Sequence, residues 1–254
     1  MAEKQTTKGA APCVDACCTI GPGAGPGVSP ESLLEEMDRA GVDWAVVHPP
    51  DNGYAFENEE GNALTTGAAK RHPDRLIAAV TANPWRPDAW DCLRRGLQAG
   101  GRILSFSPGI QGFNPADRRI DSILEKLAGD EPGIPVYIHT GHHSLGAPSQ
   151  LFLLARRFPE IPFIMGHAGA TDYAGDVVPV CRQSPNIYVE SSFARPPGFI
   201  GRIKAIGWDK GIMGSGYPLN GMMFEWSEMR RLLPADHQKA VLGGNLASLI
   251  GGLK

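Results

Sequence analysis

The segment Pro135-Val136-Tyr137-Ile138-His139-Thr140-Gly141-His142-His143 is a short apolar run that ends in a histidine and leads into a loop with two more. A second segment, Phe163-Ile164-Met165-Gly166-His167-Ala168-Gly169, has the same order of apolar residues, terminal histidine and small residues. Continuous apolar runs of this length are typical of strands buried on both faces, as in parallel sheets. The two segments therefore predict buried strands that each present a histidine at the carboxyl end.

The same strand-then-helix pattern recurs along the whole chain, with helical patterns that bury one face between the apolar runs. Expected strands lie at 14–20, 44–48, 75–81, 103–107, 135–139, 163–167, 187–191 and 211–216. Eight such units predict a single (β/α)8 TIM barrel over residues 13–254, after a flexible tail at residues 1–12. The alternative is an open doubly wound sheet, which would favour a phosphate-binding turn after the first strand. The prolines within Gly21–Gly27 disfavour that turn, because they remove amide donors.

Composition excludes several classes of partner. The chain has 24 basic and 27 acidic residues and a net charge of −3, so it lacks a basic field for nucleic acid or an anionic membrane. No apolar run is long enough for a membrane span. The five cysteines are an odd number without metal-site spacing, which indicates reduced thiols and a cytoplasmic location rather than a disulfide framework.

Polar residues gather at the predicted carboxyl ends of the strands, where a TIM barrel carries its chemistry. His139 and His167 end two strands and are the candidate catalytic residues. Candidate substrate-binding residues at the same rim are His48, His142, His143 and Glu190, with Trp85 and Arg102 as further candidates. A lone histidine at a strand end is usually structural, but five around one rim favour a functional site.

The first strand contributes a cysteine to this rim. Strand alternation places Asp15, Cys17 and Thr19 on one side, with Cys13 sharing the face of Cys17 and Cys18 directed at the helices. Cys17 is open to three interpretations: a small buried apolar residue, a metal ligand or a nucleophile. Glu190 is likewise either a functional carboxylate or half of a salt bridge at the rim.

Several motifs together resemble the amidohydrolase family, in particular its amidohydrolase-2 branch, which includes aminocarboxymuconate-semialdehyde decarboxylase-like enzymes. The resemblance covers nearly the whole chain from Val14 to Leu253. The matching segments are Val14-Asp15, Gly41-Val42-Asp43, Ala82-Asn83-Pro84, Gln111-Gly112-Phe113, Ile138-His139-Thr140-Gly141, Gly166-His167-Ala168-Gly169, Pro185-Asn186-Ile187-Tyr188-Val189-Glu190, Gly214-Ser215 with Tyr217-Pro218, and Leu242-Gly243-Gly244-Asn245.

The metal site that the resemblance implies is incomplete in this sequence. Members of the family usually bind a divalent metal through a His-x-His pair on strand one, a histidine on strand five and an aspartate on strand eight. The strand-one pair falls on Cys17 and Thr19, and the aspartate falls on Gly216. His139 matches the strand-five ligand, and His167 matches a strand-six histidine that serves as ligand or acid/base. We therefore expect no metal ligands of the usual kind and no cofactor.

Three hypotheses follow for a small-molecule site on this barrel. In the first, His139 and His167 act as acid and base without a metal, in cyclisation, elimination, isomerisation or decarboxylation, and Cys17 is a nucleophile or a polar wall. In the second, Cys17, His139 and His167 hold zinc in a reduced metal site of a hydrolase or decarboxylase. In the third, the chain is a non-catalytic pseudoenzyme that binds a small molecule or a partner. The resemblance also implies a possible homodimer.

Overall fold

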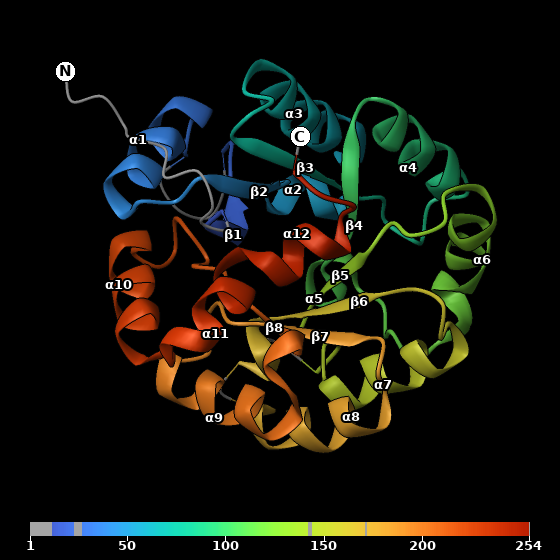
Figure 1. Ribbon diagram of the computed structural model, residues 1–254. Helices are drawn as coiled ribbons and strands as arrows, with labels where there is room; N and C mark the ends of the chain where they lie inside the picture. The colour runs from blue at the N-terminus through green and yellow to red at the C-terminus, as the bar shows by residue number, and fades with distance from the viewer. Residues whose placement is uncertain (1–11, 23–26, 142–143, 171, 254) are drawn as a thin grey trace.

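The structure, a computed structural model, describes residues 12–22, 27–141, 144–170 and 172–253. Eight parallel strands pair in sequence order, so the predicted (β/α)8 barrel is confirmed. Figure 1 shows the ring of strands surrounded by helices. The strands are β1 (Val14–Thr19), β2 (Trp44–His48), β3 (Leu76–Val80), β4 (Gly101–Phe106), β5 (Val136–His139), β6 (Phe163–Gly166), β7 (Ile187–Glu190) and β8 (Gly211–Ile212).

Helices follow each strand and cover the outside of the ring (Figure 1). The α-helices are α1 (Pro30–Ala40), α2 (Asp51–Ala55), α3 (Asn58–Arg71), α4 (Ala89–Gln98), α5 (Pro108–Gln111), α6 (Asp121–Asp130), α7 (Pro148–Arg157), α8 (Val177–Gln183), α9 (Pro196–Ile206), α10 (Met222–Leu232), α11 (Ala235–Lys239) and α12 (Asn245–Leu249). Short 3-10 turns are η1 (Arg118–Ile120), η2 (His167–Gly169), η3 (Ala174–Asp176) and η4 (Trp208–Lys210), and a π-helical turn is η5 (Ala240–Gly244).

Local sequence explains the ends of α1. The Ser29 side chain accepts a hydrogen bond from the Ser32 amide, and Pro30 stands at the first helical position, where its missing N–H costs nothing. Gly41 ends the helix in the left-handed region at φ 65°, which favours glycine. The caps that the sequence indicates therefore set both ends of this helix.

The first strand departs from simple alternation. Its pairing with β2 shifts register between Asp15 and Cys18, so the strand carries a bulge. Ala16 and Cys17 both belong to the core inside the barrel, whereas Cys18 packs in the core between the strands and the helices. The expectation that Asp15 and Cys13 share the face of Cys17 was wrong: Asp15 bonds the indole of Trp226 on α10, and Cys13 packs with the outer core. The outward direction of Cys18 is confirmed.

The ring of strands closes between β1 and the segment after β8, and α12 covers one end of the barrel. Hydrogen bonds from Ala16 to Met213, from Thr19 to Tyr217 and from Gly216 to Cys17 join β1 to the segment after β8 and close the ring. At the opposite end, α12 lies across the strands in Figure 1, and its Leu246 joins the inner core. Arg102, expected at the functional rim, instead binds the carbonyls of Ile250 and Gly252 at this opposite end, which corrects its assignment.

The segment after β2 is rich in Asn, Gly and Glu, a composition that predicts a loop. In the structure it forms α2 and the first turn of α3. Gly53 and Gly61 lie face to face, and a Cβ added at Gly53 would be 3.1 Å from the Gly61 Cα. The buried Asn58 amide donates to the carbonyls of Gly53 and Tyr54. These contacts fix α2 against α3, with Tyr54 turned inward. Within the described ranges, no helix is long and apolar enough to cross a membrane.

Candidate active site

His139 and His167 lie in direct contact at the carboxyl ends of β5 and β6. Nδ1 of His139 is 2.8 Å from Nε2 of His167, and the strands pair through His139 and Gly166. His139 is partly buried, whereas the His167 side chain is almost fully enclosed. Two imidazoles that share a hydrogen bond can exchange a proton near neutral pH, because each ring has one acceptor and one donor nitrogen.

A buried carboxylate stands at one end of this histidine pair. Glu190, at the end of β7, is 0 % exposed. Its Oε2 accepts from the Tyr137 hydroxyl at 2.6 Å, the Ser192 hydroxyl at 2.7 Å and the His167 amide at 3.0 Å, while Oε1 accepts from the Ser192 amide at 2.5 Å. Burial raises the pKa of Glu190, and these hydrogen bonds oppose that rise.

Ser192 connects the carboxylate to the histidines. Its hydroxyl donates to Glu190 and lies 2.7 Å from Nδ1 of His167. Because the hydroxyl proton is used on Glu190, the Ser192 oxygen accepts the Nδ1 proton of His167. The order Glu190–Ser192–His167–His139 is thus a continuous row of hydrogen bonds from a buried charge to a partly exposed ring.

Three polar side chains stand at the other end of the row. The Tyr54 hydroxyl is 3.0 Å from Nε2 of His139, 2.6 Å from Oγ of Ser105 and 3.2 Å from Nδ1 of His48. Nε2 of His48 lies 2.9 Å from the Ala16 carbonyl. Burial lowers the pKa of His48 to about 4, so its ring is neutral at physiological pH. His48 is therefore part of the support of the site, with both nitrogens engaged; its role as a substrate-binding residue stays a prediction.

Cys17 faces the same interior, but as a protonated thiol. Burial and the nearby Glu190 carboxylate raise the pKa of this thiol. A nucleophilic cysteine requires the opposite shift, so the surroundings of Cys17 favour a polar wall of the site over a nucleophile. All five cysteines of the chain are free thiols, as their odd number indicated.

Three glycines make room for this arrangement. A Cβ at Gly166 would collide with the Tyr137 ring, and one at Gly214 would collide with Oε1 of Glu190. Gly216 adopts φ 76°, and a Cβ there would lie 2.8 Å from the Phe193 ring. That ring in turn meets His167 edge-on, with centroids 4.9 Å apart. Phe193 thus fills the space beside Gly216, the position on which the family aspartate falls.

His167 itself has a strained backbone. Its φ is 66°, and Ala168 follows at φ 44°, a region that costs energy for residues with a Cβ. The hydrogen bond from the His167 amide to Glu190 holds this conformation. The same carboxylate therefore positions both the backbone and, through Ser192, the ring of His167.

The fit of a divalent metal to these residues can be judged from their partners. Cys17, His167 and Glu190 offer ligand atoms within 4.8 Å of one another, a donor set that suits zinc. However, both nitrogens of His139 and of His167 already meet hydrogen-bonding partners, and the Glu190 oxygens accept four protons. A metal would have to break these bonds, so the arrangement described does not fit one without rearrangement.

The remaining predicted residues fall in different places. His142 and His143 lie outside the residues that the structure describes, so their proposed contact with substrate stays a prediction. Trp85, after β3, is half exposed and stacks under the Arg119 guanidinium, 3.4 Å from the ring centroid. Sequence reasoning missed Tyr54, Ser192 and Tyr137 as parts of the site. Of these, only Ser192, two positions after the strand-end Glu190, could have been suggested by the sequence.

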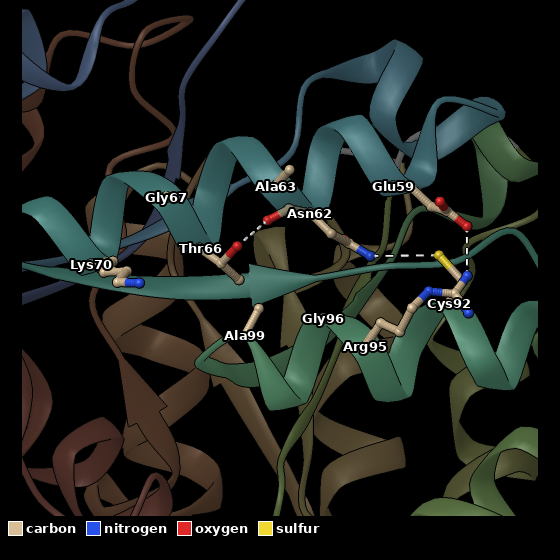
Figure 2. A pocket seen from close by; sticks show the side chains of 10 residues that line it. All are labelled: Glu59, Asn62, Ala63, Thr66, Gly67, Lys70, Cys92, Arg95, Gly96 and Ala99. Atoms are coloured by element: carbon tan, nitrogen blue, oxygen red, sulfur yellow. Dashed lines mark hydrogen bonds and ion pairs between the residues drawn. The ribbon is translucent and has the colours of Figure 1, made fainter.

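A hollow of about 380 Å³ lies outside the barrel between α3 and α4 (Figure 2). Several of its polar groups pair with one another: Arg95 binds Glu59 at 2.6 Å, and the Asn62 amide donates to the Cys92 sulfur at 3.7 Å. Burial raises the pKa of the Cys92 thiol. No histidine lines this hollow, and it lacks the proton-exchanging groups of the barrel rim.

A sequence model described as amidohydrolase matches residues 23–251, which is most of the chain. The chain belongs to the amidohydrolase family. Its place in the amidohydrolase-2 branch is thereby confirmed, as is the resemblance seen in the motifs. The matched part of the chain includes the whole row of hydrogen bonds from Glu190 through Ser192 and His167 to His139.

Solved structures share this fold at low sequence identity. An uncharacterized TIM-barrel protein, Bb4693 from Bordetella bronchiseptica, is 22% identical, with a TM-score of 0.74 over 88% of this chain and 83% of that one. A 5-carboxyvanillate decarboxylase from Novosphingobium aromaticivorans DSM 12444, complexed with manganese and 4-hydroxy-3-methoxy-5-nitrobenzoic acid, is 15% identical, with a TM-score of 0.77 over 95% and 96% of the two chains. At these identities the likeness shows the fold alone.

One relative found by sequence covers only part of either protein. A CinA-like protein from Parasynechococcus marenigrum (strain WH8102) is 32% identical over 117 residues, which is 42% of this chain. The matched part spans 27% of the length of that relative. The activity of the whole relative therefore says nothing direct about the barrel described here.

Proposed function

We propose that this amidohydrolase is an enzyme that performs acid/base chemistry on a small molecule without a metal ion, with His139 and His167 as the acid/base pair. The observation that carries the proposal is the 2.8 Å contact between the two rings, linked through Ser192 to the Glu190 carboxylate. General acid/base catalysis needs proton-exchanging groups that are held in place, and this row holds two imidazoles in fixed positions.

His139 is the member of the pair that meets the substrate in this proposal, because its ring is only partly buried while His167 is enclosed. A proton gained by His139 is shared with His167, whose Nδ1 lies 3.9 Å from the Glu190 carboxylate. The buried negative charge stabilises the imidazolium that forms, so no water molecule or metal is needed to compensate it. Cys17 contributes a neutral thiol to the wall of the site.

The reactions that fit are those that move a proton without activating water: decarboxylation, elimination, isomerisation or cyclisation. Decarboxylation is the first to test, because a neighbour with this fold is a 5-carboxyvanillate decarboxylase. In such a step the protonated His139 would give its Nε2 proton to the ring carbon that bears the carboxylate, after the Tyr54 hydroxyl has turned from Nε2 to Ser105. The bond to the carboxyl carbon then breaks, carbon dioxide leaves, and the proton is replaced from solvent.

The test measures carbon dioxide release from 5-carboxyvanillate and other hydroxylated benzoates, with enzyme dialysed against a chelator. We expect His139→Gln and His167→Gln to lose turnover by about a hundredfold or more, and His72→Gln, a histidine far from the rim, to keep it. Equal turnover in the three variants would contradict the proposal. Binding of these compounds by a folded protein with no turnover would favour the non-catalytic alternative.

A metal-dependent hydrolase or decarboxylase is the second candidate, favoured by the grouping of Cys17, His167 and Glu190. The sequence anticipated Cys17, His139 and His167 as the ligands. Metal content separates the two functions. We expect less than about a tenth of an equivalent of zinc or manganese in active enzyme, whereas a structural or catalytic zinc is bound tightly enough to persist through purification. Activity that is lost on chelation and restored by metal would establish this second function instead.

A cytoplasmic location and a homodimer stay predictions. The free thiols of all five cysteines agree with a reducing compartment. Gel filtration with light scattering would measure the oligomeric state.

A further inference from the structure

Tyr54 is a residue of the site that the family motifs do not assign. It lies on α2, is 3% exposed and reaches the histidine pair from the side opposite Glu190. Its hydroxyl meets Nε2 of His139 at 3.0 Å and Oγ of Ser105 at 2.6 Å. The rings of His48, Tyr137 and His167 surround His139 on its other sides, with centroids 4.8 to 5.5 Å away.

The directions of the hydrogen bonds can be fixed from the two ends of the row. At the Glu190 end, the Ser192 hydroxyl donates to the carboxylate, so Nδ1 of His167 must carry a proton. In a neutral His167, Nε2 is then an acceptor, and Nδ1 of His139 must donate to it. A neutral His139 with its proton on Nδ1 has a bare Nε2, which needs a donor.

At the other end, the Ala16 carbonyl only accepts, so Nε2 of His48 carries the proton of that neutral ring. Nδ1 of His48 therefore needs a donor as well, and the Ser105 hydroxyl stands 3.1 Å away. The Tyr54 and Ser105 oxygens are also 2.6 Å apart, and this contact needs one of their two hydroxyl protons. The His48 end therefore allows two patterns: Tyr54 donates to Ser105 and Ser105 to His48, or Ser105 donates to Tyr54 and Tyr54 to His139. The Glu190 end requires an unprotonated Nε2 of His139 and so selects the second pattern.

We propose that Tyr54 is a positioning residue, which donates its hydroxyl proton to Nε2 of His139 and so fixes that ring in the tautomer with its proton on Nδ1. This inference rests on the proposed acid/base function of the pair. A histidine in the wrong tautomer cannot pass a proton along the row, and an incorrect tautomer is a severe defect in other histidine-based sites.

The surroundings of Tyr54 suit a positioning role. Asn58 holds the Tyr54 carbonyl at 3.0 Å, and its own side-chain oxygen accepts from the Asn83 amide after β3. The contact of Gly53 with Gly61 sets the distance of α2 from α3. Burial raises the pKa of the Tyr54 phenol, which keeps its proton in place as a donor. The second contact, with Ser105, gives the hydroxyl an alternative acceptor whenever Nε2 of His139 carries a proton.

The experiment records the side-chain nitrogen and carbon-bound proton correlations of ¹⁵N-labelled enzyme, at a pH of about 8.5 where ordinary imidazoles are neutral. His139→Gln assigns the signals of His139. The wild type should show Nδ1 of His139 protonated and Nε2 bare. Tyr54→Phe, which removes one oxygen atom, should convert this pattern to a mixture of both tautomers, while Tyr188→Phe should leave it unchanged.

A wild-type His139 that carries its proton on Nε2 would overturn the inference without any variant, as would a Tyr54→Phe spectrum identical to that of the wild type. With a substrate from the decarboxylation assay, Tyr54→Phe should lower kcat about tenfold or more and leave KM within about twofold. A change of tautomer in Tyr54→Phe, together with a wild type that shows no turnover, would contradict the proposed function but not the role of Tyr54. Turnover that is lost in His139→Gln but unchanged in Tyr54→Phe would contradict the role of Tyr54 but not the proposed function.

Discussion

Asp15 and Glu190 are two buried carboxylates on opposite sides of the barrel wall, and their partners give them different roles. Asp15 accepts from the amides of Cys17 and Ser215 and from the indole of Trp226, all of which are structural groups. Glu190 accepts from Tyr137, Ser192 and the His167 amide. The difference lies in the groups to which those donors lead: Trp226 belongs to a helix, whereas Ser192 connects Glu190 to the two histidine rings.

The segment Met213–Tyr217 connects the two regions. Ser215 donates its amide to Asp15 outside the barrel, and Gly214 leaves room for the Glu190 carboxylate inside it. Burial raises the pKa of both carboxyls. A buried carboxyl that is satisfied only by the backbone and an indole contributes to stability, whereas one connected to histidines can also respond to chemistry.

The largest expected effect separates the two carboxylates by activity. Glu190→Gln keeps the shape of the side chain but removes the charge behind Ser192, so turnover should fall about a hundredfold or more while the fold persists. Initial rates and circular dichroism of the variant check this result. Turnover equal to that of the wild type would mean that Glu190, like Asp15, serves only the structure.

The next effect separates them by stability. Asp15→Ala leaves three buried N–H groups without their acceptor, so the free energy of unfolding should drop by about 3 kcal/mol. The histidine tautomers should stay as in the wild type, because the barrel wall lies between Asp15 and the pair. Urea titration gives the first quantity and the nitrogen spectra the second; a change of tautomer would show that the two regions are coupled.

The smallest effect is the pH dependence of Asp15. Its folded pKa is raised above the ordinary value of 3.8 by burial, so its contribution to stability is fully present below that value and is lost as the pH rises through the folded pKa. The unfolding free energy of the wild type minus that of Asp15→Asn should therefore be more positive at pH about 4 than at pH about 8. Urea titrations at both values measure it, and the reverse order would contradict the raised pKa.

The barrel could be predicted because its pattern is local: each apolar run and each helical stripe is visible within a short window. The strand ends at His48 and His139 fall where the sequence places them. The bulge at Ala16 and Cys17 was missed, because alternation alone assumes a regular strand, and the Asp15 carboxylate that bonds the Cys17 amide has no signature in spacing.

The network of the site was less predictable for a different reason. Tyr54 and His139 are 85 positions apart, and Ser105 and His48 are 57 apart. Which hydroxyl meets which ring depends on how α2 packs, and the Asn- and Gly-rich composition of that segment resembles a loop. The paired histidines were expected at one rim, yet their direct contact and its continuation to Glu190 required coordinates.

The contact between Phe193 and Gly216 bears on how this barrel could change over evolutionary time. A carboxylate side chain at position 216 would force the Phe193 ring to move, since its Cβ would lie 2.8 Å from that ring. If that ring instead became smaller first, the intermediate would leave a void beside His167. A longer side chain at position 216 is therefore expected to be accommodated only together with a change at Phe193.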